Sequence, residues 1–336
     1  MPIRDEAGSI RRSLGSVLAQ TYPHDCYDVV VADGMSSDGT RGIVEATIAD
    51  RVRAGQGPRV ACIDNPERTV SSALNRAISQ ASGELVIRVD GHCELAPDYL
   101  ATCVRVLHET GADVVGGVAR AQGQGPQGRA IAAALTSRFG VGTAAWHYAD
   151  TPRWVDTVPF ACYRRSVLER VGGFDEELVR NQDDELNFRV LQSGGRIRLE
   201  PRARAVYHCR SSLRALWQQY FEYGMYKTHV IQKRGRPASL RHLAPGALTV
   251  LLASSLAVAA RSKRPTPLVL GAGPYVFGCI VAGAIAARRG GASAIRVSLA
   301  LATMHLSYGV GFHCGLWRWR TRRSRPAVAH AVEAAS

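Results

Sequence analysis

Three short apolar runs in the first third of the chain each end beside a polar side chain that can bind a ligand. The runs are residues 28–32, 59–63 and 85–89, and the side chains that follow them are Asp33, Asn65 and Asp90. In sheets of parallel strands, ligands bind beyond the carboxyl ends of the strands. Each residue alone is as readily an ordinary turn residue. Their common position at strand ends favours a binding site for a polar or charged ligand.

A second group of acids lies far along the chain, in the segment Gln182-Asp183-Asp184-Glu185-Leu186. Asn181 can cap the helix that we expect to follow, which places Asp183 in the first helical turn. The helix dipole keeps a carboxylate ionised there, and an ionised carboxylate can take a proton from a reacting hydroxyl group. The alternative is that the three acids only decorate the start of a helix.

Alternating strand and helix patterns position these side chains. Residues 113–118 form a fourth β-type run, and helical spacing is found over 9–18, 69–81 and 97–110. This alternation predicts an α/β, Rossmann-like domain with a mostly parallel sheet and helices on its faces. Because the helical pattern already begins at Ser9, no residues remain for the first strand of such a domain, and we expect that strand to precede Pro2.

The chain is strongly basic, with a formal net charge of +14 over 336 residues. Eleven Lys and Arg residues lie between Arg196 and Arg241 against two acids, and five Arg residues lie between Arg318 and Arg325. On charge alone, such clusters suit nucleic acid or anionic lipid equally well. Eight scattered cysteines without a CxxC pair indicate free thiols in a reducing compartment. We therefore expect the soluble part of the chain to be cytoplasmic.

The last third of the chain is apolar enough to enter a membrane. Residues 243–260, 265–287 and 297–317 are uncharged stretches, and the second and third have the roughly 20 residues that a crossing needs. Before them, residues 213–221 have the spacing of an amphipathic helix on a membrane surface, with a soluble core helix as the alternative. These neighbours favour anionic lipid, and not nucleic acid, as the partner of the basic clusters.

Short motifs in order along the first two thirds of the chain resemble those of family-2 glycosyltransferases. Residues 32–40 (ADGMSSDGT) resemble the DDGSxDGT signature, and Asp90-Gly91-His92 stands at the position of the DxD motif. Residues 182–189 resemble the ED-x-[DE]-L-x-x-R motif. Further matches are Pro2 to Glu6, Asn75 with Ala77, Gly172 to Glu176, and Val206 to His208. Each motif is weak alone. Together they cover Pro2 to about Gly224 and are most similar to exopolysaccharide enzymes of the succinoglycan type.

The resemblance implies a GT-A fold and the transfer of a sugar, with inversion, from a nucleotide diphosphate donor such as a UDP-sugar. It implies that Asp183 is the catalytic base and that the donor is bound by Pro2, Arg4, Glu6, Asp33, Asn65, Arg68 and Asp90. A divalent metal, Mn²⁺ or Mg²⁺, usually neutralises the departing diphosphate, and the expected ligands are Asp90, His92 and His208. His92 replaces the second acid of DxD, so it either ligates Mn²⁺ or bonds the diphosphate directly.

The acceptor expected from the resemblance and the apolar tail is a lipid-linked saccharide in exopolysaccharide synthesis, with other polysaccharide-assembly proteins as partners. Family members that extrude long polymers carry Gln-x-x-Arg-Trp, whereas residues 217–221 here read WQQYF, which favours a single addition. Two alternatives stay open. One is a polyprenyl-phosphate sugar transferase, which charges the lipid itself, and the other is a non-catalytic basic membrane protein.

These patterns divide the chain into four parts. We expect a catalytic domain over 1–209, an interfacial helix and basic linker over 210–241, a membrane region over 242–317 and a basic tail over 318–336. Positive charges tend to stay on the cytoplasmic side of a membrane. We therefore expect 243–260 only to dip into the membrane or lie along it, while 265–287 and 297–317 cross it.

Overall fold

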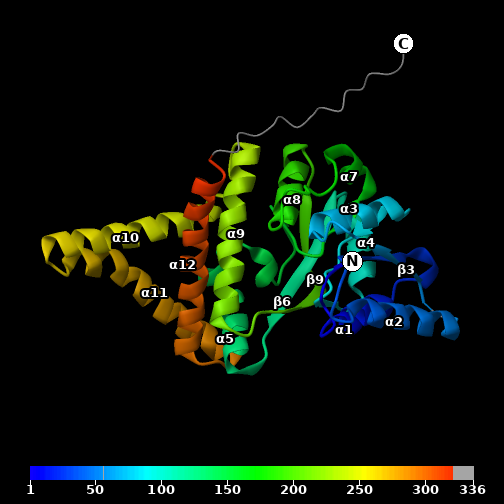
Figure 1. The fold of residues 1–336 in the computed structure, drawn as a ribbon, viewed down its shortest axis with the longest axis horizontal. Helices are drawn as coiled ribbons and strands as arrows, with labels where there is room; N and C mark the ends of the chain where they lie inside the picture. Colours follow the sequence, from blue (N-terminus) through cyan, green and yellow to red (C-terminus); the bar gives the residue numbers. More distant parts are fainter. Residues whose placement is uncertain (56, 321–336) are drawn as a thin grey trace, which may run out of the picture.

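The structure, a computed structural model, describes residues 1–55 and 57–320. Figure 1 shows a body of sheets and helices, two long C-terminal helices against its side, and a hairpin of two further helices that projects away from it. Residues 321–336, which make up most of the expected basic tail, lie outside the described residues.

The first three strands form a parallel sheet. β2 (Asp28–Asp33) pairs with β1 (Pro2–Ile3) on one side and with β3 (Arg59–Asp64) on the other. We expected no residues to remain for a first strand, but Pro2 and Ile3 form one. Two residues suffice here because the chain lies beside β2, where the Ala32 N–H donates to the Met1 carbonyl.

Three helices cover this sheet, and their ends follow from the local sequence. They are α1 (Ile10–Leu18), α2 (Thr40–Ala54) and α3 (Val70–Gln80). The Thr69 hydroxyl accepts a hydrogen bond from the Ser72 N–H and so caps α3, as threonine does at a helix start. These elements agree with the helical spacing of the sequence, and they leave the ends of β1, β2 and β3 on one edge.

The second sheet is mixed. Its strands lie in the order β4-β8-β6-β9-β5, with β7 beside β9. β6 runs parallel to β9, whereas the pairs of β4, β5, β7 and β8 with their neighbours are antiparallel. The sheet is therefore less parallel than we expected. We did not predict the antiparallel strands β7 and β8, because strands of three residues are too short to give a periodic pattern. The bounds are β4 (Leu85–Ile87), β5 (Cys93–Leu95), β6 (Val114–Gln122), β7 (Arg153–Val155), β8 (Cys162–Arg164) and β9 (Ile197–His208).

Further helices and turns complete the body. α4 packs on β6 and β9, and α5 joins the body to the C-terminal helices. The helices are α4 (Tyr99–Thr110), α5 (Gly125–Leu135), α6 (Arg138–Val141), α7 (Arg165–Val171) and α8 (Gln182–Gln192). Short 3₁₀ turns lie at η1 (His24–Cys26), η2 (Ala145–His147) and η3 (Leu240–His242).

α9 (Leu213–Arg234) and α12 (Ala294–Arg318) run side by side (Figure 1). Glycines allow this close approach: a Cβ atom on Gly224 would overlap the backbone carbonyl of Tyr308, and one on Gly311 would overlap that of Phe221. Much of the apolar face of α9, which we expected at a membrane surface, is consequently covered by α12 and by the body.

α10 (Ala244–Ser262) and α11 (Thr266–Gly290) form the projecting hairpin. Residues 240–262 and 266–290 are long and apolar enough to cross a membrane by length and composition. Within the described residues these are the two candidate spans, so our expectation that 297–317 crosses is not supported. That stretch forms α12 and packs on α9, because its glycines match the surface of that helix.

Candidate active site

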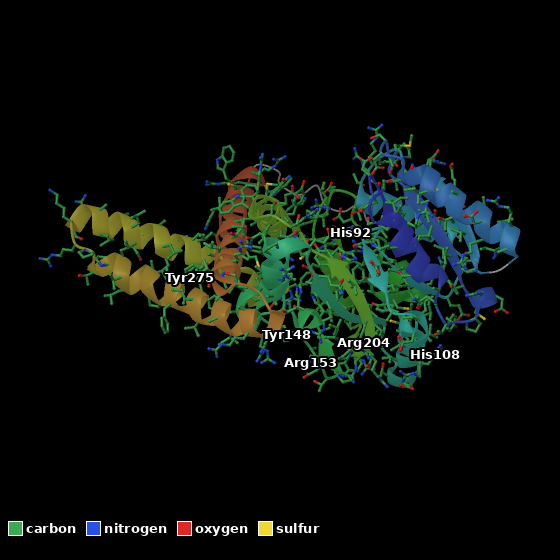
Figure 2. All side chains as sticks on the ribbon, turned by 90° about the horizontal axis from the view of Figure 1, so that it is seen from below. His92, His108, Tyr148, Arg153, Arg204 and Tyr275 are labelled. Atoms are coloured by element: carbon green, nitrogen blue, oxygen red, sulfur yellow. The ribbon has the colours of Figure 1, made fainter. Side chains whose placement is uncertain are left out.

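A cavity of about 1060 Å³ extends from the body to the C-terminal helices. Residues that follow β1, β3 and β4 line one end, the start of α8 and one side of α9 line the middle, and α10, α11 and α12 line the other end. His92 and Tyr275 mark this extent, since both line the cavity and lie far apart in Figure 2. One continuous space therefore connects the strand ends to the projecting hairpin.

Most of the site residues that we predicted from the sequence line this cavity together. They come from distant parts of the chain and are Pro2, Arg4, Glu6, Asn65, Arg68, Asp90, His92 and Asp183. Asp33 and His208 are not among the lining residues.

Asp33 is buried at the end of β2, behind the cavity wall, with 1% of its surface exposed. Its Oδ1 accepts hydrogen bonds from the Ser36 N–H at 3.1 Å and from the Ser36 hydroxyl at 2.5 Å. Its Oδ2 lies 3.7 Å from Nη1 of Arg41. The carboxylate thus orders the loop after β2, and the next residue of that loop, Gly34, does line the cavity.

His208 points away from the cavity. Its Nε2 lies 2.6 Å from Oε1 of Glu94, on the neighbouring strand β5. The preceding residue, Tyr207, lines the cavity. Successive side chains of a strand point to opposite faces. Because Tyr207 faces the cavity, His208 faces away from it. The two histidines that we expected beside Asp90 are therefore separated by the pleat of β9.

Arg88 joins two of the acids that line the cavity, Asp90 and Asp183. This arginine is 7% exposed and stands just after β4. Its Nε and Nη2 donate to the two carboxylate oxygens of Asp90, at 2.9 and 3.2 Å. Its Nη1 lies 2.6 Å from Oδ1 of Asp183, an ion pair whose angle is not that of a hydrogen bond. One buried cation thus fixes the positions of both carboxylates.

The two carboxylates differ in proton affinity. Burial raises the pKa of Asp183 and the nearby Asp90 adds to this, so the net shift is upward although Arg88 opposes it. For Asp90, burial also raises the pKa, but Arg88 and His92 together outweigh burial and the net shift is downward. We expected the helix dipole to keep Asp183 fully ionised, whereas burial dominates. A raised pKa makes Asp183 the better proton acceptor of the two.

The other acids in the first turn of α8 are held by cations. Asp184 forms an ion pair with Lys227 of α9, and Glu185, which is fully buried, pairs with Arg189 and Arg234. Asn181 occupies the N-cap position, but its φ of 62° is left-handed and its Nδ2 donates to the Tyr223 carbonyl. Its side chain therefore connects α8 to α9. We had expected this side chain to cap the helix, and it does not.

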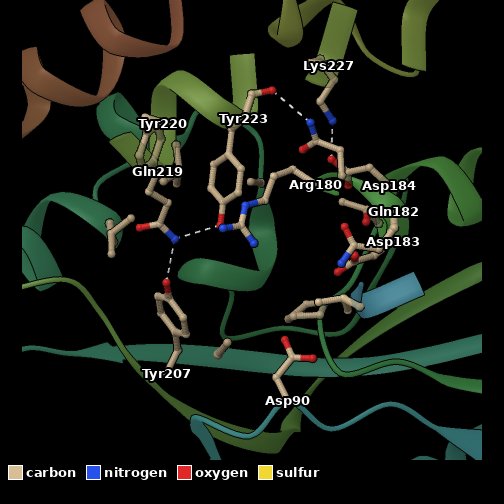
Figure 3. A pocket seen from close by; sticks show the side chains of 18 of the residues that line it. Asp90, Arg180, Gln182, Asp183, Asp184, Tyr207, Gln219, Tyr220, Tyr223 and Lys227 are labelled. Carbon is tan, nitrogen blue, oxygen red and sulfur yellow. Dashed lines mark hydrogen bonds and ion pairs between the residues drawn. The ribbon is translucent and has the colours of Figure 1, made fainter. Parts of the chain in front are cut away.

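α9 covers the middle of the cavity. The Nε2 of Gln219 donates to the hydroxyl groups of Tyr207 and Tyr223, both at 2.9 Å. Nε of Arg180, in the loop before α8, donates to Glu222 at 2.9 Å. Figure 3 shows Gln219 with Tyr207 and Tyr223 on one side of the view, Asp183 and Asp184 on the other, and Asp90 below them. The network fixes α9 against β9 and against the loop before α8.

The donor atoms expected of a metal site do not gather. His92 Nδ1 lies 2.8 Å from Oε1 of Glu6, and both oxygens of Asp90 already accept bonds from Arg88. Among residues 1–55 and 57–320, no three His, Cys, Asp or Glu side chains are placed to hold a metal ion. The side chains of this chain therefore do not fit a protein-built metal site.

Arg88 and Lys227 were not among the site residues that we predicted from the sequence. Both carried a signal: Arg88 is a charged residue inside an apolar, strand-forming run, and Lys227 lies on a helix that we expected to be amphipathic. Charged residues are almost never buried unless they are paired. A charge at a buried position therefore predicts a partner acid, although the sequence does not say which one.

The comparisons with known proteins show the family of the chain. Residues 1–172 match the family described as Glycosyl transferase family 2. The succinoglycan biosynthesis protein ExoA of Rhizobium meliloti is 30% identical over 325 residues, which are 96% of this chain and 95% of that protein. A Methanococcus voltae protein, named dolichyl N-acetyl-alpha-D-glucosaminyl phosphate 3-beta-D-2,3-diacetamido-2,3-dideoxy-beta-D-glucuronosyltransferase, is 22% identical over 69% of this chain and 73% of its own length.

A solved structure supports the fold. The mannosyltransferase PcManGT from Pyrobaculum calidifontis, in complex with GDP-Man and Mn²⁺, superimposes with a TM-score of 0.60 at 21% identity. The match covers 94% of this chain and 86% of that one. With the family match over residues 1–172 and the 30% identical relative, the predicted GT-A fold is confirmed, and the chain belongs to glycosyltransferase family 2 and is a glycosyltransferase.

Proposed function

We propose that this enzyme moves one sugar from a nucleotide diphosphate donor, a UDP-sugar, to a lipid-linked saccharide, with inversion at the anomeric carbon. The observation that carries the proposal is the continuous cavity. It joins the predicted donor residues at one end, Asp183 in the middle, and the two candidate membrane helices α10 and α11 at the other end. A donor and an acceptor that enter from opposite ends meet at Asp183.

The chemistry is a direct displacement. Asp183 takes the proton of an acceptor hydroxyl group, whose oxygen forms a bond to the anomeric carbon from the face opposite the diphosphate. The bond between that carbon and the diphosphate oxygen breaks, and the nucleoside diphosphate leaves with the electron pair. The raised pKa of Asp183 supports this role, because a base works best when its pKa approaches the working pH.

The donor end of the cavity supplies cations for the diphosphate. Arg4 and Arg68 are exposed there, and His92 lines the same end with its pKa raised. Burial lowers the pKa of His92, but the hydrogen bond to Glu6 and the nearby Asp90 together outweigh it. A divalent metal, Mn²⁺ or Mg²⁺, stays a prediction from the family resemblance. No step of the proposal passes through it, because the side chains do not gather to hold one.

The relatives support the acceptor and the pathway. The Methanococcus voltae relative is named for action on a dolichyl-linked sugar phosphate, and the Rhizobium meliloti relative is named for succinoglycan biosynthesis. The matched length of the second is nearly complete in both chains. We therefore place this enzyme in exopolysaccharide synthesis at a cell membrane, with the catalytic body on the cytoplasmic side.

The test uses the purified full chain in detergent. Thermal unfolding is measured with a panel of UDP-, GDP- and CDP-sugars, with and without Mn²⁺. We expect one nucleotide class to raise the unfolding temperature, and no stabilisation by any nucleotide would refute the proposal. The enzyme is then given the radiolabelled nucleotide sugar together with either a bare polyprenyl phosphate or a glycosylated polyprenyl diphosphate as the acceptor. Transfer only to the bare lipid would show a polyprenyl-phosphate sugar transferase instead.

A further inference from the structure

Three residues that line the cavity each carry a buried polar atom without a hydrogen-bond partner within the described part of the chain. The atoms are Nδ1 of His147 in η2, Nδ1 of His242 in η3 and the hydroxyl group of Tyr308 in α12. An unpaired buried polar group destabilises the folded protein, so a native site seldom keeps several of them. Three such residues around one cavity indicate a polar ligand that is bound there during function.

Arg241 connects the three groups. It lines the same cavity as His147, His242 and Tyr308, and its positive charge adds to the lowering of the pKa of both histidines by burial. Nη1 of Arg241 lies 2.8 Å from Oδ2 of Asp156 and donates to the Thr143 hydroxyl at 3.1 Å. No partner within residues 1–55 and 57–320 is found for its Nε and Nη2, which keep hydrogen-bond donors for a ligand.

The charged side chains beside these groups are paired with one another. Asp184 pairs with Lys227, and this pair lies close to His242. A phenol hydroxyl and a guanidinium group are strong donors, and a guanidinium group accepts no hydrogen bond. The ligand that satisfies such a set is rich in acceptor oxygens. A phosphoryl group has this property, and Arg binds it with paired donors.

The place of the group in the fold indicates where that phosphoryl group comes from. Arg241 and His242 lie at the beginning of the first candidate membrane span, residues 240–262, so they lie at the level of lipid headgroups if that span crosses a bilayer. Beyond them the cavity is lined by Leu248, Tyr275 and Met304 of the C-terminal helices. On the other side lies the first turn of α8, with Asp183 and Asp184.

We propose that Arg241, His242, Tyr308 and His147 form the subsite for the phosphate that links the acceptor saccharide to its lipid. This inference rests on the proposed function. The saccharide then extends from the phosphate toward Asp183, and the lipid chain extends toward α10 and α11. The subsite holds the acceptor by the group that all lipid-linked saccharides share, so it positions the acceptor without reading its sugar.

The test measures binding of farnesyl phosphate to the full chain in detergent by titration calorimetry. The nucleotide that stabilises the protein is present at saturation, so that the donor end is occupied. Farnesol, inorganic phosphate and phosphatidylglycerol are titrated in parallel. We expect farnesyl phosphate to bind at least about tenfold more tightly than each of them, because a charge-assisted hydrogen bond contributes roughly 1.5–3 kcal/mol.

Two variants and a control assign the binding to these residues. Tyr308→Phe should weaken farnesyl phosphate by roughly fivefold or more, and it should not lower the unfolding temperature of the free protein, because the hydroxyl has no partner to lose. Arg241→Gln should weaken binding further. Tyr27→Phe makes the same change outside the cavity, where the hydroxyl donates to the Val17 carbonyl, and should bind like the wild type.

The outcomes separate the alternatives. Equal binding of farnesol would exclude a phosphate subsite, and equal binding of inorganic phosphate would show a site for a free anion. Equal binding of phosphatidylglycerol would show a site for bulk lipid. Wild-type affinity in Tyr308→Phe would also overturn the assignment. If nucleotide binding persists while farnesyl phosphate fails, this inference is wrong and the proposed function stands. If no nucleotide binds, the proposed function itself fails.

Discussion

Nη1 of Arg88 lies 2.6 Å from Oδ1 of Asp183, while the rest of the same guanidinium group bonds Asp90. The proposed base and the acid at the donor end therefore share one buried cation. Because Arg88 opposes the effect of burial on Asp183, it sets how strongly this carboxylate holds a proton. Arg88 is a positioning residue for both acids.

The first prediction follows from this pair. In Arg88→Gln the cation is lost, so the pKa of Asp183 should rise further. The base must be ionised to act, and the acidic limb of the profile of kcat against pH should therefore move to higher pH. Arg88→Lys, which keeps the charge, should shift the limb less. Arg164→Lys is the control, because Arg164 donates to the Ala112 and Leu107 carbonyls away from the cavity. An unmoved acidic limb in Arg88→Gln would separate Arg88 from the base.

The second prediction separates the two neighbouring aspartates. Asp183→Asn should fold and bind the donor, while kcat falls by roughly a hundredfold or more, since general-base catalysis contributes about 10²–10⁴-fold. Asp184→Asn should instead destabilise the fold by about 3 kcal/mol, because it leaves Lys227 buried and unpaired. Thermal unfolding and initial rates of both variants test this. A fully active Asp183→Asn beside a stable but inactive Asp184→Asn would assign the base to Asp184.

The third prediction concerns His92 and pH. The net shift of the His92 pKa is upward. Below this pKa the ring is positively charged at the donor end of the cavity, and the ring loses that charge as the pH rises through the pKa. The affinity for the nucleoside diphosphate should fall over the same range, and the ion pair with Glu6 should lose its stabilising effect there too. Dissociation constants measured from about pH 6 to about pH 9, around the range in which histidine titrates, should show this fall.

His92→Gln should remove that pH dependence from donor binding. His108→Gln serves as the control, because His108 is exposed on α4 and well separated from His92 in Figure 2. If the affinity in His92→Gln falls with pH as in the wild type, another group near the diphosphate is responsible.

The fourth prediction concerns the hairpin. α10 and α11 have 19 and 25 residues, or about 28 and about 37 Å at 1.5 Å per residue, against a bilayer core of about 30 Å. The start of α10 and the end of α11 both lie at the body. We therefore expect the turn between them, near Ser262, on the side of the membrane opposite the body. This places Arg261, Lys263 and Arg264 against the positive-inside tendency, which makes the measurement decisive.

The measurement is cysteine labelling in intact cells. Ser262→Cys should react with a membrane-impermeant thiol reagent. Cys26, an exposed thiol of the body, should react only after lysis. A turn that stays unlabelled until lysis would mean that the hairpin enters the membrane without crossing it.

The sequence by itself determined several of the N-terminal strands and helices and the family. The runs 28–32 and 59–63 became β2 and β3, and the spacing over 69–81 became α3, because periodicity and end signals act over a few neighbouring residues. The motifs at Asp33, Asp90 and Asp183 identified the family for the same reason: each lies within one loop or one helical turn. Local sequence contains this information completely.

The tertiary structure alone decided which of these side chains meet. The pleat of β9 sends His208 to Glu94 and away from Asp90, and the sequence does not fix which face of β9 turns inward. Arg88 and Lys227 find their acids, Asp183 and Asp184, through contacts that join distant segments. We expected α12 from its apolar run to cross a membrane, whereas glycines that match those of α9 bring it against that helix. An apolar stretch can be buried equally well by lipid or by protein, and only the available partner surface decides between them.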